Sequence, residues 1–169
     1  MKKIVAGIFA LMFSCSVLAD SGPRGYWGIS GGLLTFDDGF DKVKPIQVNG
    51  RLGYDFNQYI GIGGELGFSL IEDSLYGVDF SVTTRVFYLK GGVPIDSDSR
   101  IYAVFGPSNV ELTGTYAGFS ASADDDGTAI GFGFEKGFGA GAFTIEYINY
   151  YDDKGVEVTS FNFGMLSYF

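Results

Sequence analysis

The stretch that decides the fold is PIQVNGRLGYDFNQYIGIGGELGFSLI, residues 45–71. In its first half apolar and polar side chains alternate, and this period of two is typical of a β-strand whose faces lie in different surroundings. One face carries Ile46, Val48, Leu52, Tyr54 and Phe56, and the other carries Gln47, Asn49, Arg51 and Asp55. The alternation resumes after the short break Asn57-Gln58, so residues 45–71 are predicted to form an antiparallel hairpin.

The same alternation extends in both directions from this hairpin and predicts an all-β chain. Glycine and aromatic residues are abundant, with 27 Gly, 17 Phe, 11 Tyr and 1 Trp, a composition that favours strands. Turn residues divide the chain into eight predicted strands, at residues 25–36, 45–56, 59–71, 78–90, 100–115, 128–138, 142–152 and 156–169. Most exceed the roughly 5 to 6 residues usual in soluble proteins, which agrees with tilted strands that cross a membrane.

Eight antiparallel strands of this length suit an up-and-down β-barrel, but alternation alone does not say which face points inward. A transmembrane barrel turns its apolar face to lipid, whereas a soluble secreted or periplasmic lipocalin-like barrel turns it inward around a hydrophobic ligand. The polar face is rich in Gly, Ser and Thr, which suits a narrow interior better than a surface in water. The transmembrane barrel is therefore the favoured interpretation, and the lipocalin-like carrier is the alternative.

Some segments depart from the regular pattern. In residues 78–90 the predicted outward face carries Val78, Phe80, Val82, Val86 and Tyr88, and the predicted inward face carries Asp79, Ser81, Thr83 and Arg85. Pro107 predicts a bulge or a strand end, because proline donates no ladder hydrogen bond. Residues 91–99 form a longer connection than a tight turn, and residues 116–127 are predicted to form a long outer loop.

The first residues have the pattern of a secretory signal. Two lysines precede an apolar run over residues 4–13, which is shorter than the roughly 20 residues that span a bilayer. We therefore expect residues 1–19 to be a cleaved signal peptide and residues 20–169 to be the barrel domain. Lipid attachment at Cys15 is the alternative.

Cleavage after Ala19 removes Lys2 and Lys3 and no acidic residue, so the formal net charge moves from −9 to −11. A chain this acidic repels nucleic-acid phosphates, so no nucleic-acid partner is expected.

The last predicted strand carries the most specific signal. Phe161, Phe163, Met165 and Phe169 share one face, and this arrangement resembles the terminal signal by which bacterial barrels are recognised for insertion. Together with the eight strands, it makes the chain similar to the small bacterial outer-membrane β-barrel family of OmpA-like, OmpX-like and opacity-protein-like domains. The resemblance implies a porin-like barrel in a Gram-negative cell envelope. It also implies contact with outer-membrane lipids and lipopolysaccharide, and insertion by the barrel-assembly machinery.

The residue inventory excludes most catalytic chemistry. The chain has no His, and Cys15 is its one cysteine, so residues 20–169 offer no Ser-His-Asp triad, cysteine nucleophile or ordinary zinc site. The resemblance points the same way, because outer-membrane lipid acyltransferases and deacylases built on eight-stranded barrels use a histidine. We expect no catalytic residue, no metal site, no cofactor and no enzymatic activity.

Five charged residues are predicted on the polar face inside the barrel: Arg51, Glu65, Arg85, Glu135 and Glu146. Paired carboxylates can act as general acid and base in glycoside hydrolysis. An eight-stranded interior, however, is filled by side chains, and buried charges need partners. These residues are therefore predicted to form a structural salt-bridge network in the lumen.

Acidic residues cluster between the predicted strands. These segments contain ten acidic residues, at 37–38, 41, 72–73, 124–126 and 152–153, and only three basic ones, Lys42, Lys44 and Lys154. Calcium or magnesium could bridge such loops to anionic lipopolysaccharide, although none has the spacing of an EF-hand. The other interpretation is a solvated acidic surface.

These features together predict a monomeric, non-enzymatic protein of the outer membrane, anchored by its apolar wall. Its acidic outer loops are expected to serve surface interaction and adhesion or envelope integrity. The sequence does not specify an extracellular ligand.

Overall fold

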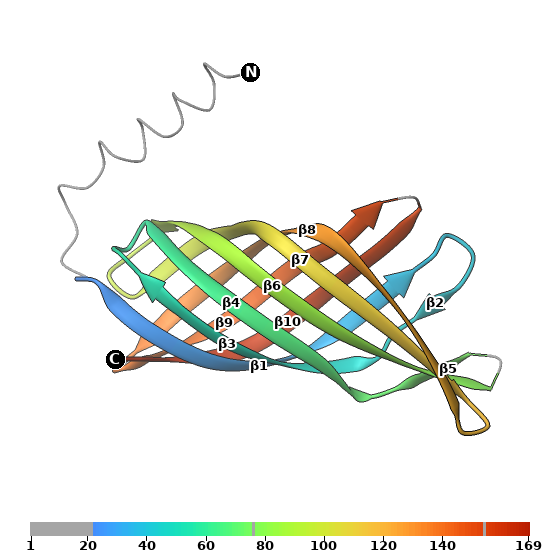
Figure 1. Cartoon of the computed structure of the whole chain (residues 1–169). Coiled ribbons are helices and arrows are strands. Elements are labelled where there is room, and N and C mark those ends of the chain that lie inside the picture. The colour runs from blue at the N-terminus through green and yellow to red at the C-terminus, as the bar shows by residue number, and fades with distance from the viewer. Residues whose placement is uncertain (1–21, 76, 154) are drawn as a thin grey trace, which may run out of the picture.

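The computed structural model describes residues 22–75, 77–153 and 155–169, which form one antiparallel sheet closed into a barrel (Figure 1). Its strands are β1 (Arg24–Asp37), β2 (Lys42–Val43), β3 (Ile46–Asp55), β4 (Ile60–Ile71), β5 (Asp73–Leu75), β6 (Val78–Pro94), β7 (Ser99–Tyr116), β8 (Phe119–Phe138), β9 (Gly141–Asp153) and β10 (Val156–Tyr168). Pairing of β1 with β10 closes the wall, and the short β2 and β5 pair with β1 and β6 at one end. The prediction of an eight-stranded antiparallel barrel is confirmed.

The predicted signal at residues 1–19, including Cys15, lies outside the described residues. None of the described residues forms a helix long and apolar enough to cross a membrane.

The barrel has two unlike ends, which we call proximal and distal. The proximal end holds Arg24, Phe169 and the turns over residues 56–59, 95–98 and 139–140. There Gly25 and Phe169 each donate a backbone N–H to the other's carbonyl oxygen at 3.0 Å. The distal end holds the connections that follow β1, β4, β7 and β9, and several strands extend beyond the wall on that side (Figure 1).

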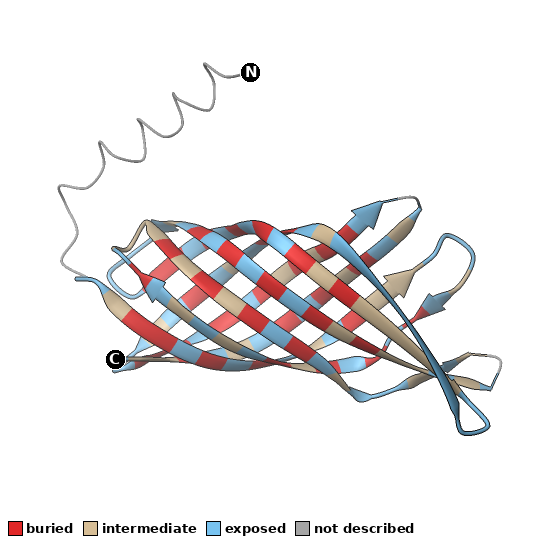
Figure 2. Ribbon diagram, viewed as in Figure 1, coloured by how far each residue is buried: buried red, intermediate tan, exposed pale blue. Residues whose placement is uncertain are grey.

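The alternation seen in the sequence is an alternation between the outer wall and the lumen (Figure 2). The apolar face of β3 points outward, where Leu52 is 64% exposed, while Gln47 and Asn49 on the other face are buried. In β8, Phe132 is likewise 64% exposed, and Glu135 is buried. Since a lipocalin-like carrier requires the opposite arrangement, this alternative is not favoured.

The faces predicted for residues 78–90 are wrong in the middle of β6. Val82, Val86 and Tyr88 are buried toward the lumen, whereas Arg85 is exposed and Phe87 is 58% exposed on the outer wall. Apolar residues occupy both faces between residues 86 and 89, so the period of two is ambiguous there. The distal half of the lumen is itself apolar, with Leu34, Val158 and other buried residues packed around the two valines.

The prediction of a long outer loop at residues 116–127 is also wrong. β7 and β8 continue as a hairpin and meet at a two-residue turn, Ala117-Gly118, where φ is 49° and 85°. Two consecutive positive φ values are typical of a tight hairpin turn, and glycine takes the second without strain. The Ser, Ala and Asp residues of this segment are weak strand formers, so the register with β7 determines the extension.

Pro107 produces neither the predicted bulge nor a strand end. Val86 pairs with Ser108 and Leu89 pairs with Phe105 in one register, and only the intervening pairs are missing. β6 and β7 stay close at this point. A Cβ added at Gly106 would lie only 2.0 Å from the carbonyl oxygen of Phe87. The connection predicted at residues 91–99 is also shorter than expected, because β6 runs to Pro94 and the turn covers only residues 95–98.

The close contact between Gly106 and the β6 backbone generates a prediction about folding. Gly106→Ala places a methyl group against the β6 backbone, which cannot move aside as a side chain can, so we expect a loss of about 1–3 kcal/mol of stability. The measurement is a gel that compares boiled and unboiled samples in mild detergent, where a folded barrel migrates faster unboiled. Gly91→Ala is the control, because no heavy atom lies within 4 Å of its added Cβ. Equal folding of the two variants would contradict the prediction.

Candidate functional site: the charged lumen and the acidic distal end

Arg51 occupies the centre of the lumen and joins three strands. It projects from β3, lies directly opposite Glu65 of β4, and reaches across the lumen to Glu146 of β9. Its Nε lies 3.0 Å from Oε2 of Glu65, and its Nη1 lies 3.2 Å from Oε2 of Glu146. The hydroxyl of Tyr150 donates to Oε1 of Glu65 at 2.7 Å. We call Arg51, Glu65 and Glu146 the central cluster.

A second charged group, the proximal cluster, lies nearer the termini. Glu135 of β8 accepts from Lys90 Nζ at 3.0 Å and from Arg100 Nη2 at 2.9 Å. Arg100 also donates to Asp55 at 2.5 Å, and Arg24 lies 3.9 Å from the carboxylates of both Asp55 and Glu135. Four of these five side chains are buried, and Arg24 is about one-third exposed.

The sequence-based prediction did not include Lys90, Arg100 or Asp55. Asp55 shares the polar face of β3 with Arg51, so its pattern already indicated a lumen position. Lys90 shares a face with Val86 and Tyr88, and the wrong outward assignment of that face concealed it. Arg100 lies at the start of β7, beside the connection whose length was overestimated.

Arg85, predicted to belong to the lumen network, lies on the outer face. Its Nη1 donates to Oδ1 of Asn109 at 2.7 Å, and its Nη2 lies 2.9 Å from Oε2 of Glu111. Since Val86 points inward, its neighbour Arg85 must point outward. The predicted set is thus divided, with Arg51, Glu65 and Glu146 together, Glu135 in the proximal cluster, and Arg85 outside the barrel.

Amide and hydroxyl groups lie next to the central cluster on its distal side, before the apolar part of the lumen begins. Asn49 Nδ2 donates to Ser30 Oγ and to Asn162 Oδ1, each at 3.2 Å, and Gln47 Nε2 donates to the hydroxyl of Tyr150 at 3.2 Å. The side chains of Glu65 and Glu146 are 0% and 1% exposed, so no polysaccharide can reach this carboxylate pair. The arrangement stabilises the barrel and leaves the pair without a substrate cleft.

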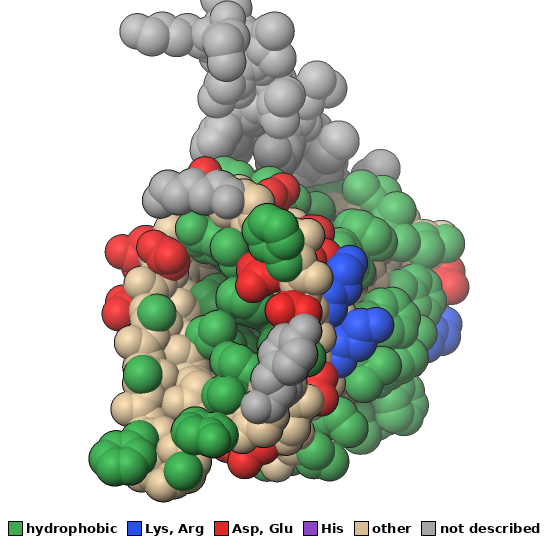
Figure 3. Space-filling model, turned by 90° about the vertical axis from the view of Figure 1, so that its right-hand side faces the viewer, with side chains coloured by type: hydrophobic (Ala, Val, Ile, Leu, Met, Phe, Trp, Pro, Cys, Tyr) green, Lys and Arg blue, Asp and Glu red, His purple; other side chains and the backbone are tan. Residues whose placement is uncertain are grey.

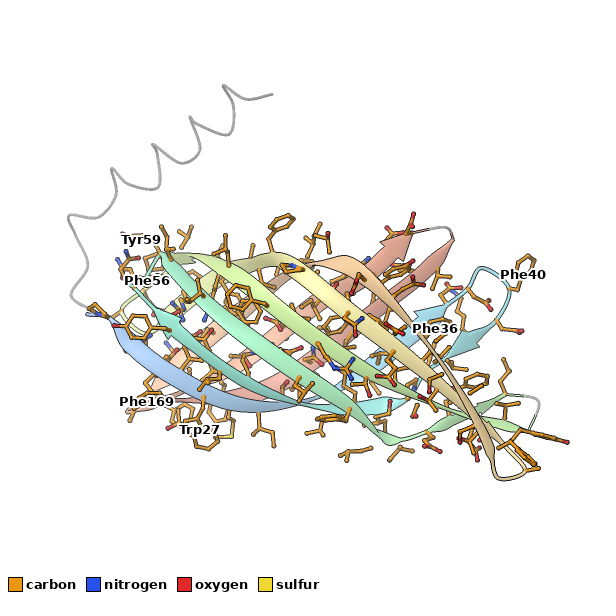
Figure 4. All side chains as sticks on the ribbon, viewed as in Figure 1. Trp27, Phe36, Phe40, Phe56, Tyr59 and Phe169 are labelled. Carbon is orange, nitrogen blue, oxygen red and sulfur yellow. The ribbon has the colours of Figure 1, made fainter. Side chains whose placement is uncertain are left out.

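The residues of the predicted insertion signal lie on the outer wall. Phe161, Phe163 and Met165 of β10 are exposed there, and Phe169 lies at the proximal end beside Gly25. Figure 4 shows Trp27, Phe56 and Tyr59 near the same end. Their positions suit an interfacial aromatic belt, and their part in insertion stays a prediction.

The acidic segments gather at the distal end, which faces the viewer in Figure 3. Acidic side chains lie at several points around the rim, and hydrophobic side chains lie toward its centre. Lys42 contacts Asp37 at 2.6 Å, and the backbone N–H of Lys44 donates to Asp73 at 2.7 Å. Within the part of the chain that the structure describes, no three acidic residues are grouped so that they could hold a metal ion.

Asp38 holds the turn after β1. The backbone N–H groups of Asp41 and Phe40 donate to Oδ1 of Asp38 at 2.7 and 3.0 Å, and they hold the pKa of this carboxyl below its ordinary value of 3.8.

The lowered pKa predicts how this turn responds to acid. The carboxylate stabilises the turn fully above pH 3.8, and this stabilisation disappears as the pH falls through the lower folded pKa. An NMR titration of the Asp41 amide is expected to show a midpoint below 3.8, and Asp38→Asn should abolish it. A midpoint at or above 3.8 would show that the turn does not favour the charged form.

The central cluster predicts a large difference between two arginines. Arg51→Met leaves two buried carboxylates without their cation and is expected to cost about 3–5 kcal/mol of unfolding free energy. Arg85→Met is the matched control, because its exposed pair with Glu111 is worth only about 0–1 kcal/mol. Urea unfolding in lipid vesicles, followed by the fluorescence of Trp27, measures both. Similar losses of unfolding free energy in the two variants would contradict the prediction that the buried lumen charges stabilise the barrel.

Comparisons with known proteins agree with this geometry. A family model described as outer membrane protein beta-barrel domain matches residues 6–169. A search of curated proteins by sequence gave no significant match.

Solved structures show the same fold at low identity. Ail, the attachment invasion locus protein of Yersinia pestis, has a TM-score of 0.69 and 17% identity over 88% of this chain and 100% of its own. Neisserial surface protein A has a TM-score of 0.70 and 11% identity over 88% and 100%. OprG of Pseudomonas aeruginosa has a TM-score of 0.60 and 14% identity over 90% and 99%. The chain therefore belongs to the outer membrane protein β-barrel domain family, and its location is the cell outer membrane.

Proposed function

We propose that this protein is a non-enzymatic anchor that holds its distal end outside the cell for surface interaction. The observation that carries the proposal is the contrast between the two ends. Proximal turns are short, whereas β7 and β8 extend beyond the point where β8 leaves β9 and end in a hairpin whose tip is exposed. Short periplasmic turns and long external connections are the usual arrangement in such barrels.

The same proposal includes the steps that place the barrel. Residues 1–19 are removed as a signal peptide, and the barrel-assembly machinery recognises the face that carries Phe161, Phe163, Met165 and Phe169. The apolar wall then contacts outer-membrane lipids and lipopolysaccharide as a monomer.

The chemistry of the distal end favours a particular kind of partner. One solved structure of Ail is described as a complex with the heparin analogue sucrose octasulfate, which is highly anionic. In this chain, by contrast, Asp124, Asp125 and Asp126 occupy the exposed hairpin. Like charges repel across an interface, so the distal end suits a cationic or neutral surface better than a sulfated glycan. Adhesion to such a surface is the favoured role, and envelope integrity is the second.

The experiment uses a strain that lacks the protein, complemented with the intact chain or with a shortened hairpin. In the shortened form an Asn-Gly turn replaces residues 111–124, joining Val110 to Asp125 in the existing register. We expect the short form to reach the outer membrane and to stay heat-modifiable, while attachment to cationic surfaces falls to the level of the deletion strain.

The two roles separate in this design. If only the deletion strain becomes sensitive to detergent and both forms attach equally, the barrel serves envelope integrity and the adhesive proposal is wrong.

A further inference from the structure

The outer part of β8 has a strand partner on one side only. β8 pairs with β7 from Phe119 to Lys136, but its pairing with β9 begins at Ile130. Residues 119–126 are all exposed, and Figure 1 shows the β7–β8 hairpin diverging from β9 and β10. The segment therefore presents an open row of backbone donors and acceptors, which is a template for another strand.

The residues that face this open side follow from strand geometry. The backbone N–H of Gly137 donates to the carbonyl oxygen of Asp98, so odd-numbered residues of β8 direct their backbone groups toward β7. The register between β7 and β8 is continuous to the turn, so this order holds throughout. Even-numbered residues, including Ser120, Ser122 and Asp124, therefore direct their backbone groups to the free edge.

A crevice of about 600 Å³ lies where the free edge meets β9. Its lining combines aromatic and aliphatic side chains with carboxylates: Ile130, Phe132, Tyr147, Tyr151, Asp126 and Asp152. The free edge of β8 thus starts at the apolar wall of the barrel, and Asp124 and Asp125 lie farther toward its exposed tip. A ligand that follows it meets apolar contacts at the base and negative charge along the way.

We propose that an extended, cationic segment of an extracellular protein adds to β8 as a further strand. Backbone hydrogen bonds to the even-numbered residues supply the affinity, and lysine or arginine side chains opposite Asp124 and Asp126 supply the selectivity. A second copy of this chain fits less well, because it would bring a second set of acidic residues, 124–126, to an edge that is already acidic. The inference rests on the proposed function for the exposure of this edge outside the cell.

The test uses the intact barrel in zwitterionic detergent and a fluorescent synthetic peptide of about ten residues in which lysine and threonine alternate. Fluorescence anisotropy measures its dissociation constant. Ser122→Pro removes one free-edge N–H, and we expect about tenfold weaker binding. Ser122→Ala is the matched control, because it loses the same hydroxyl contact with Thr113 but keeps the N–H. Its affinity should match that of the wild type.

Two further comparisons separate strand addition from simple charge attraction. Peptides with alternate backbone nitrogens methylated keep their charge, and one of the two alternating sets should lose binding. Asp124→Asn with Asp126→Asn should weaken the lysine peptide and remove its salt dependence between about 50 and 500 mM.

Equal binding of all methylated peptides and of Ser122→Pro would show attraction by charge alone and would overturn the proposal. The absence of binding by the lysine peptide at about 1 mM would do the same. Because the purified barrel is used, either failure is independent of whether the protein mediates attachment in cells.

Discussion

One constraint governs the structure: inside a bilayer every backbone N–H and C=O must find a partner within the protein. Pairing of β1 with β10 meets it, since these strands would otherwise be the open edges of the sheet. The inward and outward alternation follows from that closure, and so does the narrow interior. An unpaired edge is tolerated only beyond the lipid, and the outer part of β8 leaves its β9 neighbour at the distal end.

Because the interior is narrow, charged side chains from different strands must pair there, and this pairing affects the register of the strands as well as the stability of the barrel. Arg51 and Glu146 come from strands far apart in the sequence, and so do Lys90 and Glu135. A slip of one residue in any of these strands would turn its charged side chain to lipid and leave the partner buried alone. The two clusters thus select one register among the many that an alternating, glycine-rich sheet would otherwise allow.

The sequence predicted the fold well because the alternation of apolar and polar residues along each strand is a local pattern. Six strands have ends within one residue of the predicted ones, and the apolar face of β3 points outward as expected. The predictions are wrong where the local sequence pattern does not distinguish the two faces of a strand or does not indicate a strand at all. Between residues 86 and 89 both faces are apolar, so Arg85 was placed inside and Lys90 was not recognised. Residues 119–127 have little strand propensity of their own, and their conformation depends on a long-range register with β7 that no short pattern encodes.

The order of the two charge clusters along the barrel has an electrical consequence. In the central cluster one arginine faces two glutamates, which leaves a formal charge of −1. In the proximal cluster Arg24, Lys90 and Arg100 face Asp55 and Glu135, which leaves +1. With the acidic rim beyond them, the molecule carries a permanent dipole along its axis, positive toward the termini. Barrels inserted in one direction hold these dipoles parallel and side by side, an arrangement in which dipoles repel. The lumen charges therefore oppose close side-by-side packing of parallel copies.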